Sequence, residues 1–437
     1  AKAAICRAVL PLMIPGLLQG KSGSVVTSML PIFVRLDLHG SNSAVGAISS
    51  SYALAQLFGS APLGLLMKRC HYKTAACACL SALICTASLS FAAQSVAVLF
   101  AVRMVGGVAV TGFDIYRKAY LAAEVPSSVR GRVSSRLAGL QKLAVMFGAA
   151  LSGFFAQHLA TRSIFLVQAA FSAGALLALL AHLLIASRAP AREAASPGGG
   201  AGGRGAGGEP GLSLGLCAVA RQHWRDLVFA GGYCAMLNGC RNTWMVLMPL
   251  QGYSVGLSKQ GIGLAVAFMR AVDASLTMTS AGKIVDKYGK KAAGIPTMLL
   301  MAVAYLLIPL SRSPASLVSA AVVYAVGNGL SGGIVNAFAA ALAPAHARTE
   351  FLGLWKMTTS IGGLSMPFLF GVVSDVSGSL EVASMVTVVI ALGAATWLAL
   401  LVQEGSSCAG ARESMVASAQ TQDAPLAVRD SSDTSGG

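Results

Sequence analysis

The chain has 437 residues, of which 55% are hydrophobic and only 11% are charged, and its formal net charge is +16. Its mean hydropathy is +0.70. Soluble proteins carry about 25% charged residues, so this composition excludes an ordinary soluble domain and indicates helices that face lipid, where charge is costly.

Apolar stretches long enough to cross a bilayer, about 20 residues each, recur along the chain. We predict twelve spans, near residues 10–34, 44–67, 74–93, 97–121, 136–158, 162–186, 227–252, 260–281, 292–311, 316–342, 351–375 and 380–402. Fusing or splitting one closely spaced pair would change this count. No cleavage signal follows the first stretch, which we interpret as a retained span. The chain begins at Ala1 rather than at Met, so the native start is left open.

A change of composition divides the chain into two halves. Residues 188–225, which include the glycine-rich run 197–211, predict a flexible cytoplasmic linker between the sixth and seventh spans. The linker separates an N-terminal six-helix bundle, residues 1–187, from a C-terminal six-helix bundle, residues 226–403. The tail at 404–437 is rich in Ser, Asp and Gly, and it is predicted to be disordered.

Lysine and arginine are concentrated in the loops on one side of the predicted spans. If the N-terminus is cytoplasmic, the outer loops carry only Arg35, Arg162, Lys259 and Arg312, and most other basic loop residues lie inside. Cytoplasmic loops of membrane proteins are enriched in such residues. The distribution predicts that the N- and C-termini are both cytoplasmic, and it explains the net charge without a nucleic-acid partner.

Two loop segments repeat across the halves. GLLMKRCHYK at 64–73 and GKIVDKYGKK at 282–291 are offset by 218 residues, and the same offset relates Pro31 to Pro249, Pro126 to Pro344 and Arg130 to Arg348. Four landmarks in one register predict that each half is a six-span unit in the same orientation. Such parallel repeats occur in secondary transporters.

The second copy of the repeat resembles the signature G-x-x-x-D-R/K-x-G-R/K-R/K of the major facilitator superfamily. The matching residues are Gly282, Asp286, Lys287, Gly289, Lys290 and Lys291. The glycines permit a tight turn between two helices. The resemblance implies a twelve-span, all-α transporter that works by alternating access. It also implies that the acidic residue faces a helix N-terminus of the other half, as part of a latch on one conformation.

The first copy of the repeat departs from the signature. Lys68 stands in the place of the acidic residue and His71 in the place of the second glycine. A lysine does not complement a helix N-terminus, so we expect an asymmetric charge network. The residues that the first copy keeps, together with the acidic partner that the resemblance implies, are Gly64, Arg69, Lys73 and Glu124.

Seven charged side chains fall inside predicted spans, where a charge needs a cavity or a partner. They are Lys21, Arg103, Lys142, Arg241, Arg270, Asp114 and Asp273. The excess of cations favours an anionic solute. In the family, spans one, four, seven and ten line the central cavity, which implies that the cations of spans one, four and seven, Lys21, Arg103 and Arg241, lie near the pathway.

The cations of spans one and seven do not occupy matched positions. Aligned on Pro31 and Pro249, Lys21 and Arg241 differ by two residues. Two residues correspond to about 200° of helix rotation, enough to turn one of them away from the cavity. Polar neighbours favour a cavity position for Lys21. A pair of cavity cations on these spans resembles the organophosphate:phosphate antiporters.

The other intramembrane charges have structural alternatives. Arg103 could bond to the backbone or to a neighbouring helix. Arg270 and Asp273 are three residues apart, close enough to neutralise each other on one helix, so we favour a structural pair over a proton relay. Lys142 and Asp114 could reach the cytoplasmic interface.

Span ten contains two asparagines among four glycines, at 324–338. Close helix packing is the interpretation that we favour for the glycines. A substrate contact is left open for Asn328 and Asn336.

We expect a secondary active transporter of a small organic solute, with anionic solutes favoured. A proton-coupled exporter of amphipathic compounds and a non-transporting receptor or scaffold are the alternatives. No nucleotide-binding G-x-x-x-x-G-K-S/T motif occurs, so a gradient supplies the energy and the protein is not an enzyme. The cysteines and histidines do not cluster, so neither a metal nor a cofactor is expected. The expected partners are the bilayer, the solute and a coupling proton or counter-substrate, with the protein itself a monomer.

Overall fold

The structure, a computed structural model, describes residues 2–69, 72–124, 127–188, 216–344 and 347–402. All regular secondary structure in these ranges is helical, as the sequence predicts. The elements are α1 (Lys2–Ile32), η1 (Phe33–Asp37), α2 (Asn42–Arg69), α3 (Tyr72–Ala92), α4 (Val96–Glu124), α5 (Ser127–His158), α6 (Ser163–Arg188), α7 (Leu216–Gln222), α8 (Trp224–Ser254), α9 (Lys259–Leu276), η2 (Thr277–Ala281), α10 (Gly282–Tyr288), α11 (Lys290–Leu310), α12 (Pro314–Leu330), α13 (Ile334–Leu342), α14 (Arg348–Ser377) and α15 (Leu380–Leu400), where η marks a π-helical turn.

Serine residues define several helix starts. Ser258 accepts a hydrogen bond from the backbone N–H of Gly261, and Ser379 accepts from the first turn of α15. Ser313 forms a capping box with Ser316. These side chains satisfy backbone donors that a helix N-terminus leaves unpaired. Hydrophobic composition alone does not fix where these helices begin. The capping serines fix these positions.

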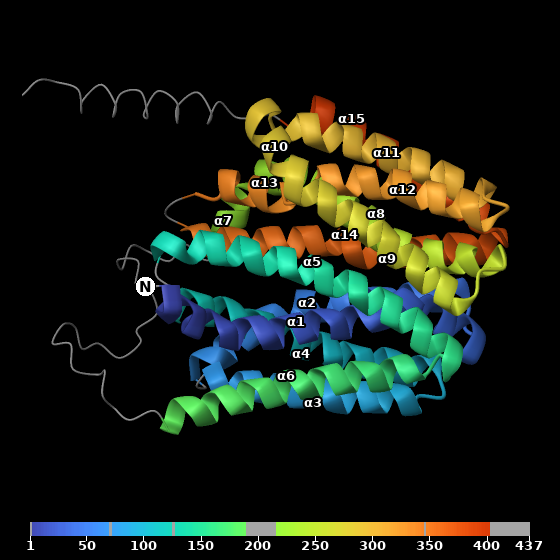
Figure 1. Cartoon of the computed structure of the whole chain (residues 1–437). Helices are drawn as coiled ribbons and strands as arrows, with labels where there is room; N and C mark the ends of the chain where they lie inside the picture. The colour runs from blue at the N-terminus through green and yellow to red at the C-terminus, as the bar shows by residue number, and fades with distance from the viewer. Residues whose placement is uncertain (1, 70–71, 125–126, 189–215, 345–346, 403–437) are drawn as a thin grey trace, which may run out of the picture.

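Eight helical stretches of the described chain are long and apolar enough to cross a membrane, namely 74–92, 96–117, 163–184, 259–285, 290–310, 314–342, 350–377 and 380–400. The remaining long helices, α1, α2, α5 and α8, lie in the same bundle (Figure 1). The all-α membrane fold is therefore confirmed. The count of twelve spans and the cytoplasmic placing of the termini stay predictions.

The long helices run side by side, with α1 to α6 on one side of the molecule and α8 to α15 on the other (Figure 1). Across the boundary between them, α2 packs against α14 and α5 packs against α9. The boundaries of the two predicted domains stay predictions. Of the predicted linker, 188–225, residues 189–215 lie outside the described residues, and α7 and the start of α8 occupy most of the rest. The predicted tail, 404–437, also lies outside the described residues.

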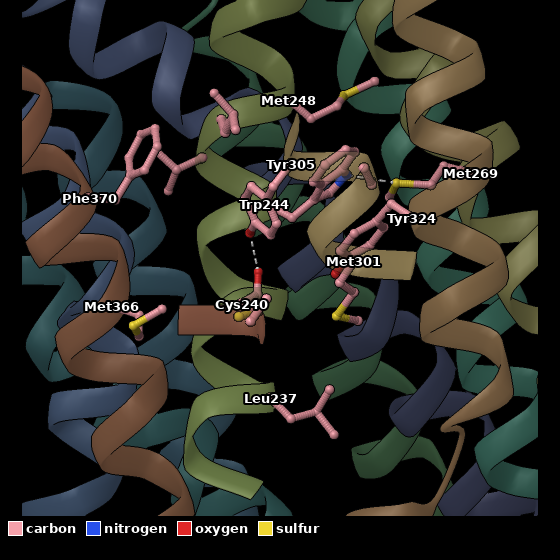
Figure 2. Packing of buried hydrophobic residues seen from close by; sticks show 14 of the residues in the cluster. Leu237, Cys240, Trp244, Met248, Met269, Met301, Tyr305, Tyr324, Met366 and Phe370 are labelled. Atoms are coloured by element: carbon pink, nitrogen blue, oxygen red, sulfur yellow. Dashed lines mark hydrogen bonds between the residues drawn. The ribbon is translucent and has the colours of Figure 1, made fainter. Parts of the chain in front are cut away.

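A close aromatic cluster holds α8 in a fixed rotation. The Trp244 ring stacks on Tyr324 with centroids 4.2 Å apart, and Tyr305 meets it edge-on at 5.3 Å. The Trp244 indole N–H donates to the sulfur of Met269 at 3.1 Å, and the Tyr305 hydroxyl donates to the Cys240 carbonyl at 2.5 Å (Figure 2). Aromatic pairs of this kind stabilise a structure by more than the burial of their apolar surface alone would. It ties α8 to α9, α11 and α12 on the face away from the site described below.

Span ten is not one continuous helix. Gly333, with φ +86°, separates α12 from α13. The glycines before it lie against neighbouring helices: a Cβ at Gly327 would stand 2.9 Å from Leu300 and one at Gly329 2.7 Å from Leu276. The packing interpretation of these glycines therefore agrees with the structure.

Candidate functional site

A cavity of about 370 Å³ lies between α1, α2, α4, α8 and α14. Three basic side chains line it: Arg103 from α4, Arg241 from α8 and Lys356 from α14. No Asp or Glu is among the described residues that line it, and the other lining groups are mostly hydroxyls and amides. We call this cavity the cationic chamber.

Arg241 is oriented toward the chamber by α12. Its Nε donates to Asn328 Oδ1 at 2.7 Å, and its Nη2 donates to Ser331 Oγ at 2.7 Å. Both acceptors are neutral, and the ion pairs found in the described part of the chain do not include Arg241. The guanidinium is therefore held in place with its charge uncompensated by a carboxylate in the described residues.

The two-residue offset between Lys21 and Arg241 does not turn Arg241 away from the cavity. The residues of α8 that line the chamber are Asn238, Arg241, Asn242 and Met245, whose spacing of three and four places them on one helix face. Lys21 lies on α1, but its side chain is outside the described residues, so its predicted cavity position stays a prediction.

Arg103 is almost fully buried, with 5% of its surface exposed. Its Nε donates to the carbonyl of Ile48 at 3.4 Å, and its guanidinium lies 4.3 Å from the ring centroid of Tyr52. Both partners are on α2. A cation over an aromatic face is attracted by the ring quadrupole. The structural interpretation of Arg103 thus agrees with these contacts, although the side chain also lines the cationic chamber.

Lys356 is not among the cavity residues predicted from the sequence. The signal was present, because the lysine falls within the predicted span 351–375 and Thr359, Ser360 and Gly363 follow at three, four and seven residues. This spacing predicts one polar helix face. All four residues line the cationic chamber.

A second cavity of about 390 Å³ lies between α1, α2, α4, α5, α8 and α9. It shares Thr27, Tyr52 and Met245 with the cationic chamber, so the two chambers adjoin. We call it the paired-charge chamber, because its described charged side chains, Asp114, Arg117 and Arg270, all have partners.

The pairs of this chamber follow helical spacing. Arg117 lies 3.6 Å from Asp114 on α4, and Arg270 lies 3.7 Å from Asp273 on α9. The predicted neutralisation of Arg270 by Asp273 is therefore present in the structure. Asp114 lines the chamber with 45% of its side chain exposed, whereas the sequence left open a position at the membrane interface.

Asp273 also connects the two groups of helices. The Lys142 amine, on α5, lies 3.6 Å from its carboxylate and donates to Thr277 Oγ1 at 2.7 Å. Only 7% of the Asp273 side chain is exposed, against 35% for Lys142. The structure thus places Lys142 beside a buried carboxylate on another helix, where each charge compensates the other, in place of the interface position that the sequence left open.

We expect Lys142→Met to lower the melting temperature of the purified protein, since it removes one cation from a buried carboxylate. Melting curves of Lys142→Met, Asp273→Asn and the double variant should give a coupling energy of about 0.5–3 kcal/mol, as for residues in contact. Lys283→Met, which removes an exposed lysine from α10, is the matched control. Additive effects of the two substitutions would contradict the bridge.

The two groups of helices are in contact at the end of the bundle that the charge distribution predicts to be outside, here called the outer end. Asp375, near the end of α14, accepts hydrogen bonds from the backbone N–H groups of Asn42 at 2.9 Å and Ser43 at 2.7 Å. These residues begin α2, so the carboxylate caps a helix N-terminus across the boundary. A Cβ atom at Gly46 would overlap the carbonyl of Pro367.

A second seal at the outer end joins α5 to α9. A Cβ atom at Gly153 would stand 2.8 Å from the Cα of Gly263. The Lys259 amine donates to Thr161 Oγ1 at 2.7 Å, and its backbone N–H donates to Gln157 Oε1 at 3.2 Å. These contacts join the two groups of helices at the outer end.

The remaining site predictions fall in three groups. Asn328 binds Arg241, whereas Asn336 is exposed on α13 and lines neither chamber. Several motif residues are described: Gly282 begins α10, and Gly289 has φ +89°. The Lys287 amine lies over the Tyr288 ring and the Lys290 amine over the Phe338 ring. The Lys291 amine donates to the Ala399 carbonyl. The side chains of Arg69, Lys73, Glu124 and Asp286, and the surroundings of Gly64, lie outside the described residues.

Comparison with known proteins agrees with this architecture. Residues 13–269 and 229–421 match the family model described as Major Facilitator Superfamily. The nucleoside transporter NupG has a similar structure, with a TM-score of 0.71, 15% identity, and coverage of 91% of this chain and 100% of that one. The D-xylose-proton symporter has a TM-score of 0.69 and 17% identity, with coverage of 92% of this chain and 98% of that one. The human organic anion transporter MFSD10 (TETRAN) has a TM-score of 0.60 and 18% identity, with coverage of 90% of this chain and 99% of that one. Comparison with curated protein sequences gives no match.

Proposed function

The chain belongs to the major facilitator superfamily and is an integral, multi-pass membrane transporter, and we propose that it carries a small organic anion by alternating access of two six-helix bundles. The observation that carries this proposal is the cationic chamber. Arg103 and Arg241 line it, and neither is in an ion pair with a described carboxylate.

An anion in this chamber compensates charge that the protein alone leaves unbalanced. A cation within a membrane protein is costly unless a partner or water stabilises it. A bound carboxylate or phosphate would supply that partner, and it would form charge-assisted hydrogen bonds with the arginine fork. The cavity volume of about 370 Å³ lies within the range of small-molecule sites. These features support an anionic organic solute.

The structural neighbours do not choose the solute by themselves. Two are named for nucleoside and D-xylose transport, which concern uncharged solutes, and one is named for organic anions. The charge of the chamber therefore decides the proposal. The exporter alternative requires a group that carries the coupling proton, and no Asp or Glu is among the described residues that line the cationic chamber.

Three probes of one length and different charge test the proposal: hydroxyhexanoate, hexanediol and aminohexanol. We expect only the anion to stabilise the purified protein in a thermal-shift assay. In proteoliposomes we expect saturable, gradient-driven uptake of the labelled anion without ATP. Preferential binding of the diol or the amine would contradict the anionic assignment. A strict ATP requirement would contradict secondary transport, and binding without flux would favour the receptor alternative.

A further inference from the structure

The two chambers differ in how their charges are balanced. In the cationic chamber, Arg103 and Arg241 are held by neutral groups. In the paired-charge chamber, Arg117 lies beside Asp114, and Arg270 lies beside Asp273. An anionic group entering the second chamber would therefore meet arginines that already have carboxylate partners, and it would face the exposed Asp114. Because Asp273 is shared between Arg270 and Lys142, an excess cation remains beside the second chamber. Among the described lining residues, however, the arginines without a carboxylate partner are those of the first chamber.

Together, the two chambers are large enough to hold one solute that occupies both. Their volumes are about 370 and 390 Å³, and they meet at Thr27, Tyr52 and Met245. Much of the second chamber is formed by the glycines of α1 and by valines of α4, α5 and α9. Such a surface suits an uncharged body with some apolar area, not a second ionised group.

We propose that the substrate is an elongated organic anion charged at one end. Its anionic group binds in the cationic chamber beside Arg241, and its uncharged body extends past Tyr52 into the paired-charge chamber. This inference rests on the proposed function, because it takes the anion in the first chamber as given. It excludes small inorganic anions and anions with a charge at each end as the preferred substrates.

Gly23 provides a direct steric test of the second chamber. It lies on α1 and lines the chamber, and a Cβ atom added to it would meet no heavy atom within 4 Å. A leucine at this position would extend into the chamber from a Cβ atom that has no neighbour within 4 Å, and leucine favours a helix more than glycine does. Gly393, on α15, is an equally open glycine that lines neither chamber.

The experiment compares a short and a long anion, glycolate and hydroxyhexanoate, which share a carboxylate and a terminal hydroxyl. Binding to wild-type protein, Gly23→Leu, Gly393→Leu and Arg241→Gln is measured by calorimetry. We expect Gly23→Leu to weaken the long anion about tenfold and to leave the short one within about twofold. Gly393→Leu should change neither affinity, and Arg241→Gln should weaken both. Adipate, with a carboxylate at each end, should bind no tighter than hydroxyhexanoate.

The outcomes distinguish failure of this inference from failure of the proposed function. An equal effect of Gly23→Leu on both anions, or tighter binding of adipate, would overturn the elongated, single-ended substrate while leaving anion transport intact. Failure of every anion to bind the wild-type protein would overturn both. Should the leucine variant misfold, Gly23→Ala adds a single methyl group and should weaken only the long anion, about twofold. Unchanged binding of the long anion by that variant would also count against the inference.

Discussion

Arg241→Gln is expected to weaken the binding of an organic anion at least tenfold, which corresponds to about 1.4 kcal/mol. The guanidinium lines the cationic chamber, and its hydrogen bonds go to Asn328 and Ser331, which carry no charge. Glutamine keeps hydrogen-bonding capacity and removes the positive charge. Titration of the purified protein with hydroxyhexanoate, followed by calorimetry, measures the change.

Two further variants distinguish the effect of the positive charge of Arg241 from the effect of its hydrogen bonds to α12. Arg241→Lys keeps the positive charge but loses the planar fork that bonds to α12, so we expect a smaller loss of affinity than with glutamine. Arg312→Gln removes an exposed arginine from a loop at the outer end, and it should leave affinity unchanged. Native affinity of Arg241→Gln, together with a lower melting temperature, would mean that the arginine only ties α8 to α12.

Gly46→Leu is expected to reduce transport at least tenfold by preventing closure of the outer end. A side chain at Gly46 would overlap the backbone of Pro367, which α14 cannot move without displacing the whole helix. Overpacking of a helix contact costs about 1–3 kcal/mol or more, enough to shift a balance between two conformations strongly. Uptake into proteoliposomes gives the rate. Labelling of Ser49→Cys by a membrane-impermeant thiol reagent, in the same background, reports whether the outer end has opened.

The control for this substitution lies on the partner helix. Gly353 of α14 has no heavy atom within 4 Å of an added Cβ, so Gly353→Leu should transport normally. Asp375→Asn should have a milder effect in the same direction, because a carboxylate at an exposed helix N-terminus contributes about 0.3–1 kcal/mol. Normal uptake by Gly46→Leu, with the cysteine at position 49 still protected, would show that the contact of α2 with α14 does not govern closure.

Sequence alone determined the features that depend on neighbours along the chain. The apolar, all-helical character follows from hydropathy. The family follows from a short motif whose Gly289 adopts φ +89°, a conformation that glycine adopts readily. The pairing of Arg270 with Asp273 follows from the helical repeat, since residues three apart lie on one face. None of these requires knowledge of how two helices meet.

Tertiary structure decided the features that depend on helix rotation and on contacts between distant segments. The partner of Asp273 on α5, Lys142, is 131 residues away in sequence, and the sequence did not predict this pair. The cavity positions of Arg241 and Lys356 were likewise set by packing. Helices in lipid are apolar on most of their circumference, so hydrophobic periodicity does not indicate which face turns inward. That rotation is set by close contacts such as the Trp244 stack, and only the packed structure contains them.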